Sequence, residues 1–249
     1  VCPDCIGLPE ELAIVHLALE KYQLVVVAMS SLDRVASKCW SSSDGPRVAK
    51  VLLQLQQDMG GTLPILAFGA SSGGHFVSTI LPKAIKDAGG QLAGFISQIM
   101  GAPPAVPDVP AVYITMDRDK GTDKAANRIC QQQQAENVPA KHIRLAPRTV
   151  ANLYFSERIT TISVDQSKKM VEALQAAHML DDATSRLTDD PRQSNWRSIL
   201  SDYKGDDTMV ADQSPLSEVL NVAWGMHEMS RDGVADALEF LLERGKTKC

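Results

Sequence analysis

The sequence predicts an α/β protein in which a mostly parallel β-sheet is covered by helices on both faces, forming a three-layer sandwich. Strand and helix signals alternate through the first half of the chain, which is the pattern of parallel strands joined by helical crossovers. Residues 24–28 form a continuous apolar, β-branched run, as expected for a strand buried on both faces. A strand expected at 65–68 runs directly into a glycine-rich turn that opens a helix.

Size and composition set the limits of this fold. The chain has 249 residues, of which 44% are hydrophobic and 22% charged, and this suits one α/β domain spanning residues 1–249. A net charge of −5 without a basic stripe argues against nucleic acid as a partner. No apolar run approaches the roughly 18 residues that a membrane-spanning helix needs. Compartment and oligomeric state stay open.

Caps and apolar spacing predict the individual elements. Pro9 fits the first turn of a helix that runs to about Lys21. Asp44 caps a second helix, whose apolar residues recur at helical spacing until Gly60 ends it. After the strand at 65–68, further strands are expected at 92–99, 111–116 and 142–145, and helices at about 72–88, 122–137, 215–224 and from about 230 onward.

The chain changes character after Pro147. A helix capped by Ser163 should reach about Leu180, because Gln166 completes a capping box. A polar stretch separates this helix from the next. We expect residues 147–224 to form a helical insertion or lid just before the last helix. A scaffold extension that covers the sheet edge is the alternative.

The five cysteines carry little information. Cys2 and Cys5 form a single CxxC pair, and a zinc site would need two more ligands at a recognisable spacing, which do not follow. Free thiols or one local disulfide are the simpler interpretation, and the state of Cys2, Cys5 and Cys39 stays open. We therefore expect no metal site.

The chemistry of the chain is expected at Gly69-Ala70-Ser71-Ser72-Gly73, where a strand turns into a helix. In this context a GxSxG motif forms a strained turn that pushes the serine hydroxyl out above the sheet. Small residues are needed because a side chain at Gly69 or Gly73 would collide across the turn. Ser71 is the expected nucleophile, and the N–H of Ser72 is the expected oxyanion donor. The alternatives are Ser72 as nucleophile, or a turn without chemistry.

This arrangement resembles the α/β-hydrolase superfamily of serine hydrolases, of the esterase and lipase type. The resemblance covers roughly residues 9–146 and 225–244, and it implies a triad in the chain order serine, acid, histidine. Asp119 stands a few residues past a strand end, where the family has its acid, and Asp117 is the alternative. His227 lies in the break before the last helix, which is the family's histidine position.

The other histidines fit this pattern less well. His142 opens a strand, which is the wrong end for a site at the strands' carboxyl edge. His178 should lie inside an amphipathic helix, and His75 precedes the acid in the chain. His75 is instead expected to line the pocket or to pack against the sheet.

Two methionines, Met226 and Met229, flank the break that holds His227. Apolar residues in so short a segment predict a loop tucked against the body of the protein, which would present His227 to Ser71. The imidazole would then take the serine proton during attack on a carbonyl, while the carboxylate orients the ring and stabilises its charge.

The implied activity is hydrolysis of a carboxylic ester of a small molecule or lipid through an acyl-enzyme, without a metal or organic cofactor. The second hypothesis is a hydrolase-fold protein that has lost catalysis and serves as a binding or interaction module. A third hypothesis is a phosphate-binding loop at 69–74, but this loop lacks the Lys-Ser/Thr of a Walker motif.

Two features depart from the family pattern. The family has strands before its first helix, and the loop after one of them donates a second oxyanion N–H. Here the first helix begins near Pro9, so those strands are missing from the chain and the completeness of the oxyanion hole stays open. The insertion at 147–224 also lies after the position of the family's usual cap.

Overall fold

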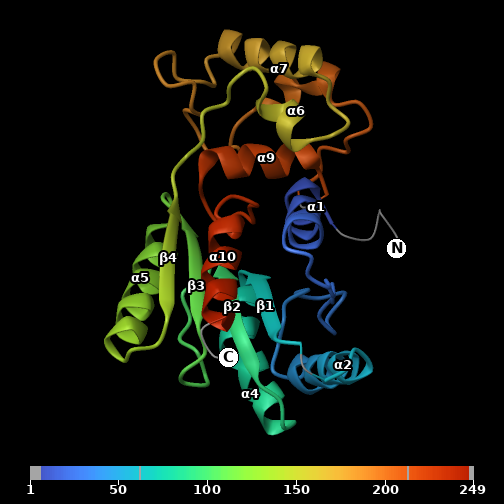
Figure 1. The fold of residues 1–249 in the computed structure, drawn as a ribbon. Coiled ribbons are helices and arrows are strands. Elements are labelled where there is room, and N and C mark those ends of the chain that lie inside the picture. The colour runs from blue at the N-terminus through green and yellow to red at the C-terminus, as the bar shows by residue number, and fades with distance from the viewer. Residues whose placement is uncertain (1–6, 62, 212, 247–249) are drawn as a thin grey trace. The chain divides into compact units, whose positions relative to one another are not determined.

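The computed structural model of the protein describes residues 7–61, 63–211 and 213–246 (Figure 1). The described chain divides into two units, each with its own buried apolar core. The sheet unit comprises Val27–Thr115, Asp119–Leu145 and Asp232–Cys249. The helical unit comprises Val1–Val26, Met116–Arg118 and Ala146–Arg231.

Within the described residues, four parallel strands form one sheet, as predicted. They follow one another in chain order: β1 (Ile65–Ala70), β2 (Leu92–Gln98), β3 (Ala111–Met116) and β4 (Ala140–Leu145). The register pairs Ala70 with Gln98, and Gln98 with Ile114. The carboxyl ends of β1, β2 and β3 therefore lie at the same edge of the sheet, where β3 continues past Ile114 to Met116.

Helices cover both faces of this sheet, which gives the three layers expected from the sequence. On one face, Phe95 and Tyr113 of the strands pack with apolar residues of the helices before and between the strands. On the other, a Cβ added to Gly94 would lie 2.9 Å from Leu241 of the last helix. The helices of the unit are α2 (Asp44–Asp58), α3 (Ser72–His75), the π-helix η3 (Phe76–Ile80), α4 (Leu81–Asp87), α5 (Lys120–Ala135) and α10 (Val234–Lys246).

The helical unit has a separate core around Trp196, Phe155 and Leu174, which are at most 1% exposed. The segment 147–224, predicted as a helical insertion, lies within this unit together with the first helix. Its elements are α1 (Pro9–His16), the π-helix η2 (Leu17–Lys21), α6 (Tyr154–Arg158), α7 (Val164–Ala176), α8 (Trp196–Ile199), the 3₁₀ helix η4 (Ser201–Tyr203) and α9 (Pro215–Trp224).

A buried carboxylate ties α1 to the rest of the helical unit. Glu10 is fully buried, and its Oε1 lies 2.7 Å from Nη1 of Arg158. Its Oε2 accepts from the backbone N–H of Arg231 at 2.8 Å. The Glu10 N–H donates to Oε2 of Glu218 at 3.1 Å. Burial, reinforced by the nearby Glu11 carboxylate, raises the pKa of Glu218 well above its usual range.

One predicted element and several boundaries were wrong. Residues 24–28 form no strand, and Val25 and Val27 are 63% and 40% exposed. A β-branched run becomes a strand only where a neighbour offers backbone hydrogen bonds, and none of the described strands pairs with this segment. The helix predicted to reach Leu180 ends at Ala176, and the last helix begins at Val234 instead of near Ser230.

None of the helices in the described ranges is long and apolar enough to cross a membrane.

Candidate functional site

Ser71 lies in a strained turn between β1 and α3. Its backbone angles are φ 51° and ψ −116°, and such a conformation costs a non-glycine residue about 1–3 kcal/mol. The Ser71 N–H donates to the Gln98 carbonyl of β2 at 2.9 Å, and the Ser71 carbonyl accepts from the His75 N–H at 3.0 Å. The sharp strand-to-helix turn expected of the motif is present, with Ser71 at its strained position.

Two glycines make this turn possible, and one of them, Gly69, was predicted from the sequence. A Cβ at Gly69 would lie 2.3 Å from the Gly73 carbonyl oxygen, which is a severe clash with backbone. A Cβ at Gly73 would lie 3.5 Å from the Trp40 ring, which is an ordinary contact, so the prediction for Gly73 was wrong. Gly74 is the second restricted position, because a Cβ there would lie 2.8 Å from Met100.

Ser72, the predicted oxyanion donor, is the first residue of α3. Its N–H is therefore one of the first-turn donors that have no acceptor within the helix. Its Oγ accepts from the Trp40 N–H at 3.4 Å, and the Trp40 ring stacks on Phe76 with centroids 4.5 Å apart. The Ser72 hydroxyl thus takes part in anchoring the loop that precedes α2.

The two predicted acids follow β3 but belong to different units. Asp119 lies in the sheet unit and caps α5, since its Oδ1 accepts from the Thr122 N–H at 3.3 Å. Because adjacent strands are spaced about 4.8 Å apart, the ends of β1 and β3, which carry Ser71 and Asp119, lie roughly 10 Å apart on the same edge. Asp117 lies in the helical unit, where the next residue, Arg118, donates its N–H to the Gly225 carbonyl at 3.0 Å.

The histidine loop, residues 225–231, also lies in the helical unit. Gly225 ends α9 with φ 77°, and His227 itself has φ 44°. The Glu228 carboxylate accepts from Nδ2 of Asn221 at 2.9 Å, and burial raises the pKa of Glu228. Met226 is 39% exposed and Met229 is half-buried, so Met226 does not pack against the body of the protein as predicted. Polar contacts hold the loop instead.

Of the other histidines, His142 takes part in a polar network that the sequence did not indicate. Oγ1 of Thr115 donates to Oδ1 of Asp123 at 2.8 Å and lies 2.7 Å from Nε2 of His142. Burial lowers the pKa of His142. Although burial opposes it, hydrogen bonds from Arg144 and Thr115 lower the pKa of Asp123. The network joins β3, β4 and α5, which is a structural role.

The structure corrects part of the expectation for His75 and the helical position expected for His178. His75 is exposed, and its ring lies within hydrogen-bond distance of the Thr79 hydroxyl, so it does not pack against the sheet. His178 lies beyond the end of α7 with φ 55°, where the helix has already stopped.

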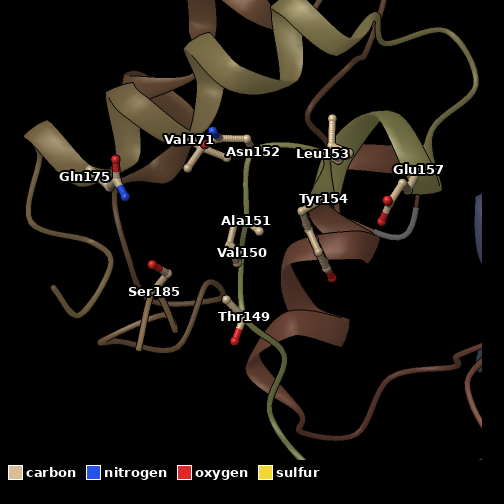
Figure 2. Close-up of a pocket in the computed structure, with 10 residues that line it drawn as sticks. All are labelled: Thr149, Val150, Ala151, Asn152, Leu153, Tyr154, Glu157, Val171, Gln175 and Ser185. Carbon is tan, nitrogen blue, oxygen red and sulfur yellow. The ribbon is translucent and has the colours of Figure 1, made fainter. Parts of the chain in front are cut away.

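Two cavities in the described residues are lined by residues other than the predicted site residues. A cavity of about 460 Å³ lies within the helical unit, where the 149–154 segment lines it together with side chains of α6, α7 and a later turn (Figure 2). A second cavity, of about 670 Å³, lies between α2 and α4. Neither is lined by Ser71, Asp119 or His227.

In the part of the chain that the structure describes, no group of three or more His, Cys, Asp and Glu side chains is arranged to hold a metal ion. Cys39 and Cys130 are free thiols, exposed and buried respectively. Cys2 and Cys5 lie outside the described residues, so the predicted thiols or disulfide at this pair stay a prediction.

Comparisons of the chain with models of protein families, with curated proteins and with solved structures gave no match. The parallel sheet with its covering helices is compatible with α/β-hydrolase-like folds. Any functional assignment therefore depends on the geometry of the chain itself.

Proposed function

We propose that the protein is a serine hydrolase of the α/β-hydrolase type that cleaves a carboxylic ester, with Ser71 as its nucleophile. The observation that carries this proposal is the Ser71 backbone, at φ 51° and ψ −116°. Strained non-glycine residues of this kind persist where the surrounding structure holds them, and they cluster at active sites. A turn without chemistry could use glycine at no such cost. The strain therefore supports a role for the serine side chain.

In the proposed mechanism, His227 takes the proton of Ser71 as the serine Oγ attacks the ester carbonyl carbon. The N–H of Ser72, at the start of a helix, stabilises the resulting oxyanion. Collapse of this intermediate expels the alcohol, which takes the proton from the imidazolium, and leaves an acyl ester on Ser71. Water then gives a proton to His227 and attacks the acyl carbon. The second intermediate collapses, His227 returns this proton to Oγ of Ser71, and the carboxylic acid is released. These steps use only side chains, one backbone N–H and water.

Asp119 is the proposed acid of the triad, and Asp117 is the alternative. Asp119 caps α5 just beyond the end of β3, at the edge of the sheet where Ser71 follows β1. One observation favours Asp117: the neighbouring Arg118 is bonded to Gly225, in the unit that also contains His227. The role of either acid would be to fix the imidazole tautomer and stabilise its charge.

Two conservative variants distinguish these acids. Asp119→Asn should lower turnover of a p-nitrophenyl ester by about 10³- to 10⁴-fold while leaving the fold intact, and Asp117→Asn should have a smaller effect. The reverse ranking would move the acid to Asp117. Small and equal effects would remove both from the triad.

Labelling with a fluorophosphonate probe tests the proposed function itself. We expect the wild-type protein to be labelled, Ser71→Ala to remain unlabelled, and Ser72→Ala, the matched control, to keep its labelling. Turnover of p-nitrophenyl esters of increasing acyl length would then separate a small acyl substrate from a lipid. A folded wild type that stays unlabelled would overturn the proposal and support the second hypothesis, a binding or interaction module without catalysis.

A further inference from the structure

Arg192, in the segment between α7 and α8, contacts three consecutive residues of the histidine loop within the helical unit. Its Nη1 donates to the Met226 carbonyl at 3.0 Å, and its Nη2 donates to the His227 carbonyl at 3.1 Å. Nη2 also lies 3.3 Å from Oε2 of Glu228. A planar guanidinium can make these contacts together, because its donors point in fixed and different directions. One side chain thus holds the loop at and around His227.

The turn that carries Arg192 is itself anchored. The Arg192 N–H donates to Oδ1 of Asp190 at 2.9 Å, and its guanidinium lies 3.8 Å from the same oxygen. The next anchor is Pro191, whose carbonyl accepts from the indole N–H of Trp196 at 3.0 Å. Trp196 is 1% exposed and belongs to the core of the helical unit. The guanidinium is therefore presented from a fixed base, so less conformational entropy is lost when it binds the loop.

The histidine loop needs such support because regular structure does not supply it. His227 is a non-glycine residue at φ 44°, which is a strained conformation. The loop lies between the end of α9 and the start of α10, so its carbonyls are outside the hydrogen-bond ladder of either helix. Glu228 extends the support, because the Oε2 that contacts Arg192 also accepts from Nδ2 of Asn221.

We propose that Arg192 is a positioning residue, which fixes the His227 backbone and thereby the direction in which the imidazole leaves the loop. This inference rests on the proposed function, in which His227 is the general base. A base must stay within hydrogen-bond reach of the proton that it takes, and a misplacement of about 1 Å can lower a rate on the order of 100-fold. The segment between α7 and α8 would then serve the reaction as well as the packing.

Variants of the full chain test this role. In Arg192→Ala, fluorophosphonate labelling of Ser71 should slow by about 10- to 100-fold. Arg192→Gln and Arg192→Lys each keep part of the donor set, so they should give intermediate rates and also serve if the alanine variant fails to fold. Arg186→Ala is the matched control: Arg186 is an exposed arginine of the same segment, and its replacement should leave the rate unchanged.

A second readout separates positioning from a general contribution to stability. In isotope-labelled protein, Arg192→Ala should increase the mobility of the His227 amide, while the melting temperature stays close to that of the wild type. If the wild type labels at Ser71 and the Arg192 variants label at the same rate with an equally rigid loop, the inference is overturned and the proposed function stands. A wild type that does not label overturns both.

Discussion

The strand-to-helix turn at Ser71, here called the elbow, and the loop at His227 both hold a non-glycine residue at positive φ, 51° and 44° respectively, but by different means. At the elbow, backbone contacts from the adjoining strand and the next helical turn fix the conformation. In the loop, charged side chains from remote parts of the chain do so: Arg192 bonds a carbonyl 35 residues later, and Glu10 bonds an N–H 221 residues later. Steric rules within a short motif can be recognised from sequence. Contacts between residues far apart in the chain occur at no fixed sequence spacing, so they cannot be recognised in this way.

Removing the Glu10 carboxylate, which makes the contact of longest sequence separation, should have the largest effect on stability. Glu10→Ala removes the carboxylate that lies 2.7 Å from the 7%-exposed Arg158 guanidinium, and breaking a buried ion pair by removing one partner costs about 3–5 kcal/mol. We expect a corresponding loss in the free energy of unfolding, measured by urea denaturation. The matched control is Glu157→Ala, at an exposed position of the same unit, which should change stability little. Equal effects of the two variants would mean that charge pairs do not hold the helical unit.

At the elbow, we expect close approach of backbone atoms to decide which glycines can be replaced. Gly69→Ala places a methyl group 2.3 Å from the Gly73 carbonyl oxygen, so we expect a loss of about 3 kcal/mol in stability, with loss of probe labelling at Ser71. Gly73→Ala, whose added methyl meets Trp40 at 3.5 Å, should be tolerated in both assays. If the two variants behave alike in thermal melts and labelling, close backbone approach does not define the turn.

The same contrast explains how much could be predicted from the sequence. The four strands and the turn at Ser71 were predicted because apolar runs and a glycine-rich motif act locally. The run at 24–28 was misassigned because its apolar composition does not supply a pairing partner. Arg192 and Glu10 were not identified as site or core residues. Most charged residues are exposed to solvent, so their identity in the sequence predicts exposure. Only the three-dimensional structure shows that these two side chains bind distant segments of the chain.

The pH dependence of stability tests the role of the buried Glu218 carboxyl in the helical unit. Burial raises the pKa of Glu218 in the folded protein, so the folded state holds this proton above the pKa of the unfolded chain. Its contribution to stability is therefore complete below that unfolded value and is lost as pH rises toward the folded pKa. Glu218→Gln should remove this dependence, so its stability advantage over the wild type should grow between pH 6 and 8, by up to about 1.4 kcal/mol per pH unit.

Urea denaturation at several pH values measures this difference. Glu172→Gln, at an exposed position on α7, is the control and should follow the wild-type profile. A wild-type profile that rises with pH over this range, with Glu218→Gln parallel to it, would contradict the assignment of a buried, protonated carboxyl.

The smallest expected effect concerns the strain stored at the elbow. Ser71→Gly relieves the positive φ of a non-glycine residue and should stabilise the protein by about 1 kcal/mol while abolishing labelling. Ser72→Gly, at a helical position, should instead lower stability by about 0.5–1 kcal/mol. Melting curves of the two variants compare the positions directly. A destabilised Ser71→Gly would indicate that no strain is held there for function.

The central claim is that Ser71 and His227 act in one reaction, and a crystal structure of the fluorophosphonate-treated protein tests it most directly. We expect phosphorus bonded to Oγ of Ser71, with a phosphoryl oxygen about 2.7–3.1 Å from the Ser72 N–H. We also expect the His227 ring within hydrogen-bond reach of the adduct, around 2.6–3.2 Å. Phosphorus on another residue would contradict the claim, as would a His227 ring more than about 8 Å from Ser71, well beyond that reach.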